Sequence, residues 1–345
     1  MIDSSYSGMR KVFDLKHKIK IISASAVGGE KEKKGPLGQY IDIYCDDADL
    51  KQDSWEKAEN EMCRLALNTA LAKADLADKN LDILLAGDLM NQCSGTGYGL
   101  CDFDVPYFGL YGACSTMVQG IMTGALLIDS GHINSCAVVV SSHFCSAERQ
   151  YRYPLAYGSF SETTSQHTVT GAGAFVLSIA NDDEEGVFVT ECLPGIVTDR
   201  GIKDAGNMGA AMAPAAADTI TRYILDRGKE KISKTGMILT GDLGTEGKAL
   251  TTEFLRTNNI ELGEKYNDCG VMIYDTKKQD VGCGGSGCGC SAVVTAGYLF
   301  NMLSTGKINS CAIAGTGAMM SPQDLLQGKT IPAIAHLIKL EGAKK

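Results

Sequence analysis

Two copies of one sequence pattern constrain the fold of this chain more than any other feature. Residues 131–137 read Gly-His-Ile-Asn-Ser-Cys-Ala, and residues 306–312 read Gly-Lys-Ile-Asn-Ser-Cys-Ala, 175 positions later. A Cys-Ser pair stands upstream of each copy, at 114–115 and at 290–291, with an offset of 176. In both copies, a Cys-Ser pair is therefore followed by the same seven-residue pattern.

A third match extends the pattern upstream. Residues 85–89 (Leu-Ala-Gly-Asp-Leu) match residues 239–243 (Leu-Thr-Gly-Asp-Leu). Three matches in the same order indicate a duplicated strand–loop–helix–strand unit. We therefore expect an N-terminal half over residues 1–185 and a C-terminal half over residues 186–345.

Hydrophobic spacing predicts strands that alternate with helices along the chain. Residues 55–73 carry apolar side chains at helical spacing, and Ser54 is a suitable N-cap for that helix. The other expected elements are strands at 19–27, 81–86, 105–110 and 136–142, and helices at 117–130, at 292–303 and from about Asp218 onward. This alternation predicts an α/β fold with right-handed crossovers and mostly parallel sheets.

In open α/β sheets, ligands bind beyond the carboxyl ends of the strands. That rule places Asp88, Cys114, His143, Asp242 and the glycine-rich run 282–289 on one face of the molecule. This face is where we expect the functional site.

Charge and composition exclude several classes of function. The net charge is −9 and no long Lys/Arg cluster exists, which argues against nucleic-acid binding. No apolar stretch reaches the roughly 18 residues that span a bilayer, and no signal peptide is evident. The 13 cysteines are odd in number and lack a short-period framework, which favours a reducing compartment. We expect an intracellular protein whose membrane contact would be peripheral.

Cys114 is the strongest candidate for chemistry. It stands between a predicted strand and a predicted helix, where the helix dipole and free N–H groups lower the pKa of a thiol. A nucleophilic cysteine is built in this way. The alternative is a small residue in a crowded turn, and Cys290 occupies the equivalent turn of the second half.

Three more polar side chains follow the strand at 136–142. His143 ends that strand, and Arg149 and Arg152 lie shortly after it. An arginine fork matches the geometry of a carboxylate. The alternatives are a structural histidine and surface ion pairs.

The glycine-rich run 282–290 fits no familiar phosphate or metal motif. It lacks the Lys-Ser/Thr of a P-loop, and its three cysteines lack a fourth ligand nearby, so we expect neither a metal nor a cofactor. We interpret it as backbone that approaches the site or the other half closely. The chain has five histidines, and the second half contributes only His336. A cysteine nucleophile normally needs a base within reach, so this scarcity argues against ordinary catalysis.

A set of short motifs resembles the thiolase superfamily and, much more closely, the stage V sporulation protein AD (SpoVAD) family. The motifs lie at residues 35–38, 54–56, 86–92, 112–116, 141–143, 147–154, 168–174, 212–219, 267–270 and 284–288. The resemblance covers about residues 20 to 335. It implies a thiolase-like five-layered αβαβα fold made of two duplicated halves.

The resemblance also implies a role in sporulation. Members of this family bind dipicolinic acid or its calcium chelate and act in its transport into the developing spore. They work with membrane subunits of the same sporulation assembly, which implies a peripheral position at the inner membrane of the forespore or spore. Thiolase relatives commonly dimerise through the sheet region, so a homodimer is implied by analogy.

The departures from the superfamily pattern favour binding over catalysis. Condensing enzymes place a nucleophile where Cys114 stands and add histidine or asparagine from loops that match Asp242 and the run 282–290. Those partners are absent here, so the resemblance implies a protein that is not an enzyme.

Our hypothesis is a ligand pocket at the Cys114 turn, where condensing enzymes carry their nucleophile. It is lined by Cys114, Ser115, His143 and Asn91, with Arg149 or Arg152 compensating the ligand's charge. Asp242 either faces calcium or lies outside this pocket. The alternatives are a thioester-forming acyltransferase that uses Cys114 and a structural subunit whose pocket is empty.

Overall fold

The computed structural model describes residues 11–151 and 163–343. The elements before residue 180 are β1 (Phe13–Gly28), α1 (Glu30–Lys33), β2 (Ile43–Tyr44), α2 (Trp55–Lys73), β3 (Ile83–Gly87), α3 (Ser94–Gly99), β4 (Tyr107–Gly109), α4 (Thr116–Asp129), β5 (Ser135–Ser142), α5 (Phe144–Tyr151), β6 (His167–Thr168) and β7 (Gly171–Ile179).

The remaining elements repeat much of this order. They are β8 (Gly186–Leu193), α6 (Met208–Arg227), α7 (Lys229–Ser233), β9 (Met237–Thr240), α8 (Gly244–Thr257), β10 (Tyr266–Asp268), α9 (Cys269–Ile273), β11 (Gly285–Ser286), α10 (Cys288–Val293), α11 (Phe300–Ser304), β12 (Ser310–Ala318), α12 (Pro322–Leu326) and β13 (Ala333–Ala343). A π-helical segment, Val294–Leu299, joins α10 to α11. The helix expected at 292–303 is therefore present and longer than predicted.

The strand order of the large sheet is symmetric about its middle. Within the described residues the order is β10-β9-β12-β13-β8-β1-β7-β5-β3-β4, with β2 paired to β1 off this path. Outward from the junction of β1 and β8, both directions show the same order of strand pairings, which is two antiparallel pairs followed by two parallel pairs. The topology thus matches the duplication inferred from the repeat, while the domain boundary at 185/186 remains a prediction.

The expectation of mostly parallel sheets is wrong for the centre of the sheet. β3 pairs in parallel with β4 and β5, and β9 pairs in parallel with β10 and β12. The central strands β1, β7, β8 and β13 all pair in antiparallel fashion with one another and with β5 and β12. A buried strand has the same apolar pattern in either direction, so the sequence did not distinguish the two.

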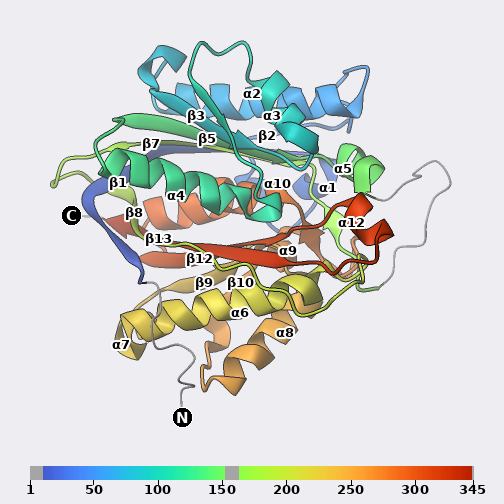
Figure 1. Ribbon diagram of the computed structural model, residues 1–345. Coiled ribbons are helices and arrows are strands. Elements are labelled where there is room, and N and C mark those ends of the chain that lie inside the picture. Colours follow the sequence, from blue (N-terminus) through green and yellow to red (C-terminus); the bar gives the residue numbers. More distant parts are fainter. Residues whose placement is uncertain (1–10, 152–162, 344–345) are drawn as a thin grey trace.

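The elements stack into five layers (Figure 1). α2 and α3 cover one outer face, α6 and α8 cover the other, and α4 with α10 lies between the two parts of the sheet. This is the αβαβα arrangement expected from the resemblance.

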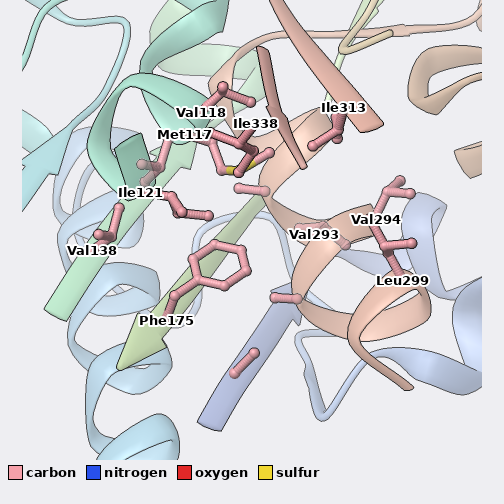
Figure 2. Packing of buried hydrophobic residues seen from close by; sticks show 14 of the residues in the cluster. Met117, Val118, Ile121, Val138, Phe175, Val293, Val294, Leu299, Ile313 and Ile338 are labelled. Carbon is pink, nitrogen blue, oxygen red and sulfur yellow. The ribbon is translucent and has the colours of Figure 1, made fainter. Parts of the chain in front are cut away.

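The core is centred on the middle helical layer (Figure 2). Met117, Val118 and Ile121 of α4 pack with Phe175 of β7 and Ile338 of β13, and all are almost completely buried. Because side chains from both halves meet there, the middle layer fixes one half against the other.

One of the two predicted helix starts agrees with the structure. Ser54 caps α2 as predicted, with the Lys57 N–H donating to its hydroxyl oxygen at 3.3 Å. The start of α6 was predicted wrongly, because the helix begins at Met208 after the N-cap Asn207 and contains Pro214. In the described part of the chain, no helix combines the length and apolar character needed to cross a bilayer.

Candidate functional site

The carboxyl ends of β3, β5, β9 and β12 meet at one edge of the molecule, and Cys114 lies there. It sits in the 3-10 turn Ala113–Ser115 that leads into α4. The Ser115 hydroxyl donates to the Gly112 carbonyl at 2.6 Å, and the Thr116 hydroxyl donates to the Ala113 carbonyl at 2.6 Å. Ala113 takes a φ of 50°, a strained value for a non-glycine residue, and the turn holds it there.

Asp242 of the second half faces Cys114 of the first. Its carboxyl group is buried and hydrogen-bonds the Cys114 thiol. The Gly287 N–H donates to one oxygen at 2.9 Å, and the Thr316 hydroxyl donates to the other at 2.7 Å. Asp242 therefore contacts Cys114 but does not line the described cavity, which agrees with the expected alternative that it lies outside the pocket.

The electrostatics oppose a reactive thiol. Burial raises the pKa of the Cys114 thiol well above its usual value, and the Asp242 carboxyl raises it further. The pKa lowering expected from the helix N-terminus is thus wrong, because desolvation and a facing carboxyl group outweigh the helix dipole. Burial also raises the pKa of Asp242 to about 8, so this carboxyl group is largely protonated at neutral pH.

A cavity of about 440 Å³ opens beside Cys114. Its wall is mostly apolar and aromatic, with a few polar groups, as in many small-molecule sites. The lining residues that matter here are Tyr111, Cys114, Glu148, Tyr151, Met319 and Asp324. Two carboxylates, Glu148 and Asp324, and no Lys or Arg belong to the described lining.

His143 has a structural role. It is buried, its Nε2 lies 2.6 Å from the Ala48 carbonyl oxygen, and its Nδ1 accepts from the Cys145 N–H at 3.2 Å. Burial lowers the pKa of His143, which keeps the ring neutral. Both ring nitrogens are engaged and His143 does not line the described cavity, so its role as a ligand donor stays a prediction that this geometry does not support.

The other predicted ligand residues are also engaged elsewhere. Ser115 is buried in its own turn, and the Asn91 side chain accepts from Gln150 at 3.0 Å. Arg149 is half-exposed, pairs with Glu56 and lies over the Trp55 ring. Of the predicted set, Cys114 alone lines the described cavity, and Arg152 lies outside the described residues.

Sequence reasoning missed Glu148, Tyr151 and Asp324. The first two stand in the motif 147–154, where an expected anionic ligand favours the arginines over Glu148 and Tyr151. Tyr151 donates to the Leu89 carbonyl at 2.8 Å and lies 2.8 Å from the Tyr111 hydroxyl, so it closes one wall. Asp324 belongs to the short helix α12, which no sequence signal connected with the site.

The glycine-rich run allows close backbone contact, as interpreted from the sequence. A side chain at Gly289 would approach the Gly171 carbonyl oxygen to 2.5 Å. Gly287 takes a φ of 95°, which favours glycine, and its N–H reaches Asp242. No group of His, Cys, Asp or Glu among the described residues is arranged to hold a metal ion.

The arrangement of sheet and helices is a thiolase-like fold. The chain is similar to 3-oxoacyl-[acyl-carrier-protein] synthase III from Aquifex aeolicus VF5, with 15% identity, a TM-score of 0.56 and coverage of 94% of this chain and 99% of that one. It is also similar to OleA from Xanthomonas campestris, of which one variant structure aligns with 12% identity, a TM-score of 0.60 and coverage of 96% and 97%. At these identities the likeness concerns the fold alone.

The sequence comparison is more specific. The family model for stage V sporulation protein AD (SpoVAD) matches residues 9–341. The chain is 40% identical over 334 residues to stage V sporulation protein AD of Bacillus subtilis (strain 168), covering 97% of each protein. The chain therefore belongs to the stage V sporulation protein AD family, and it is a sporulation protein.

Proposed function

We propose that this protein binds dipicolinic acid, as its calcium chelate, in the cavity beside Cys114 and does not catalyse a reaction there. The observation that carries the proposal is the pairing of Cys114 with Asp242. A thiol that is buried beside a carboxyl group stays protonated and is a poor nucleophile. The cavity nevertheless remains open, which suits a binding role.

The oxygen atoms of the described wall favour the chelate. Glu148 and Asp324 add carboxylate oxygens to the lining, and Asp324 is also ion-paired with Lys329 at 2.7 Å. A calcium ion held by the ligand accepts further oxygen ligands of this kind. Tyr111 and Tyr151 provide aromatic surface for a planar pyridine ring.

Calorimetric titration tests this proposal directly. Dipicolinate is titrated into the protein with and without calcium, and into the Cys114→Ala and Asp324→Asn variants. We expect saturable binding with calcium that weakens by roughly tenfold in either variant, since each loses a contact in a buried wall. Cys101→Ala, at an exposed cysteine outside the cavity, is the matched control. Equal affinity in all variants, or no binding with calcium, would refute the assignment.

An acyltransferase is the second candidate, because the structural neighbours are condensing enzymes and Cys114 keeps their turn. This candidate predicts stoichiometric acylation of Cys114 when the protein is mixed with an acyl-CoA. We expect no acylation, and mass spectrometry of the intact protein measures it.

We also propose that the protein is a homodimer and acts with membrane subunits of the sporulation assembly in dipicolinate transport, at the periphery of the inner spore membrane. For the dimer, β4 is the last strand of the described sheet, and Tyr107, Phe108 and Tyr111 beside its free edge are exposed. An unpaired edge with exposed aromatic side chains favours pairing with another chain. Light scattering should report a dimer for the wild type and a monomer for Phe108→Lys, and a wild-type monomer would contradict the dimer.

A further inference from the structure

A short pair of strands joins the two halves beside the Cys114 cavity. β6 of the first half pairs in parallel with β11 of the second. The His167 N–H donates to the Gly284 carbonyl at 2.8 Å, and the Val169 N–H donates to the Ser286 carbonyl at 2.9 Å. Both strands also contribute to the cavity wall, through Thr168 and Ser286. The β6–β11 pair therefore fixes two parts of that wall against each other.

Gln166 extends this connection to Asp242. Its side chain is buried, with 3% of the residue exposed. The Gln166 Nε2 donates to the Asp242 carbonyl oxygen at 2.6 Å and to the Gly285 carbonyl oxygen at 2.9 Å. An amide nitrogen has two N–H donors, and these two contacts use both. One side chain of the first half thus binds both the turn after β9 and the glycine-rich run of the second half.

The backbone packs closely around the Gln166 amide. A Cβ atom at Gly244 would lie 3.3 Å from the Gln166 Nε2 and 2.7 Å from the Cys283 carbonyl oxygen. Gly244 also takes a φ of 66°, a conformation that favours glycine. The Asp242 turn is therefore placed by direct contact with Gln166 and the glycine-rich run.

Different elements hold the backbone and the carboxyl group of Asp242. Gln166 holds the backbone carbonyl, whereas the Thr316 hydroxyl and the Gly287 N–H donate to the carboxyl oxygens at 2.7 and 2.9 Å. The carboxyl group then meets the Cys114 thiol, and burial together with this facing carboxyl raises the pKa of the thiol. The other titratable groups that interact with Asp242 are Asp268 of β10, Cys269 of α9, and Cys288 and Cys290 of α10.

We propose that Gln166 is a positioning residue that holds the Asp242 turn of the second half against the Cys114 turn of the first and thereby suppresses the reactivity of the thiol. Gln166 does not line the described cavity, so it acts through Asp242. The same contact keeps the cavity walls of the two halves in place for the ligand, and this part of the inference rests on the proposed function. The alternative is a contact that contributes only to overall stability.

Alkylation of Cys114 by iodoacetamide tests the positioning role, because the thiolate displaces iodide far faster than the thiol does. Gln166→Met keeps most of the side-chain volume and removes both N–H donors. We expect Cys114 in this variant to react about tenfold faster above pH 8, where the Asp242 carboxyl is ionised and opposes a thiolate in the wild type. The increase should be smaller near pH 6, where that carboxyl is protonated. Peptide mass mapping separates Cys114 from the other cysteines.

Gln279→Met is the matched control. Gln279 also connects the two halves, since its Nε2 donates to the Lys31 carbonyl at 2.8 Å and its Oε1 accepts from the Asp275 N–H at 2.9 Å. These contacts do not involve the Asp242 turn. We expect this variant to change the alkylation rate of Cys114 by less than about twofold.

A double variant shows whether Gln166 acts through Asp242. In the Asp242→Asn background the carboxylate is already absent, so Gln166→Met should raise the alkylation rate by less than about threefold. If Gln166→Met fails to fold, Gln166→Glu replaces it, because a protonated carboxyl group can still donate to one of the two carbonyl oxygens. We expect an intermediate increase in that variant.

Three alkylation results would overturn the positioning role. They are an unchanged rate in Gln166→Met, an equal increase in Gln279→Met, and an equal increase with and without the Asp242 carboxyl group. Calorimetric titration with dipicolinate and calcium tests the ligand part, and we expect Gln166→Met to weaken binding by about fivefold. Unchanged affinity would overturn that part. If the wild type binds no calcium dipicolinate, the proposed function fails, while the alkylation rates still decide the role of Gln166.

Discussion

The two halves of the molecule place the same Cys-Ser pair at the same turn, yet only one turn opens to a cavity. Cys114 lies in a tight turn after Ala113 and lines the cavity. Cys290 lies inside α10, is completely buried, and its sulfur is 3.6 Å from the Gly241 carbonyl oxygen. The position of Ala113 is taken by Gly289 in the second half, where the backbone packs directly against Gly171.

The aspartates that follow β3 and β9 differ in the same way. Asp88 accepts from the Met90 and Thr96 N–H groups at 2.8 and 2.7 Å, so it stabilises a loop of its own half. Asp242 instead faces Cys114 across the junction between the halves. Equivalent aspartates of the two halves therefore have different partners, because Asp88 binds backbone of its own half and Asp242 contacts the Cys114 turn of the other half.

The largest expected effect tests the close packing of the second turn. Gly289→Ala would place a methyl group 2.5 Å from the Gly171 carbonyl oxygen, and we expect a loss of about 3 kcal/mol or more in the free energy of unfolding. Gly97→Ala has open space around it and should be neutral or slightly stabilising. Urea unfolding compares the two, and equal stability would mean that the turn is not closely packed.

The next effect compares Asp242 and Asp88, each with a pKa that burial raises, at different pH values. The pKa of Asp242 is raised from 3.8 to about 8, so its contribution to stability is complete below about pH 4 and is lost as the pH rises toward 8. Asp242→Asn should therefore gain roughly 1–3 kcal/mol relative to the wild type between pH 5 and pH 8.

Asp88→Asn serves as the comparison in the same thermal and urea measurements. An amide at position 88 would turn a donor toward backbone N–H groups, so we expect destabilisation at both pH values. A flat difference between Asp242→Asn and the wild type across this pH range would show that Asp242 is already ionised.

A smaller effect distinguishes the two cysteines. Cys290→Ala removes a sulfur atom from the core and should cost about 1–2 kcal/mol, whereas Cys114→Ala borders a cavity and should cost less. Ligand binding should show the reverse order. If Cys290→Ala weakened dipicolinate binding as much as Cys114→Ala, the functional difference between the turns would be lost.

The smallest effect compares equivalent helices of the two halves. Ser54 caps α2 and Asn207 caps α6, each by accepting one backbone N–H. Alanine at either position should lower the free energy of unfolding by about 1 kcal/mol. A difference of more than about 1 kcal/mol between the two variants in the free energy of unfolding would show that the two halves contribute unequally to stability.

The sequence by itself determined the α/β fold and the family, and it predicted the Cys114 turn as the site. Repeated motifs and helix caps are local signals, and they can be recognised without knowledge of distant contacts. Ser54 illustrates this, because a cap depends only on the residues that follow it.

The tertiary structure alone decided what surrounds Cys114. Asp242 lies 128 positions further along the chain, and its protonation depends on burial that no sequence window contains. The sequence predicts His143 as a ligand donor, but in the fold its ring contacts the Ala48 carbonyl oxygen. Burial, hydrogen bonding and local charge depend on groups that are distant in sequence, and these groups decided the environment of Cys114.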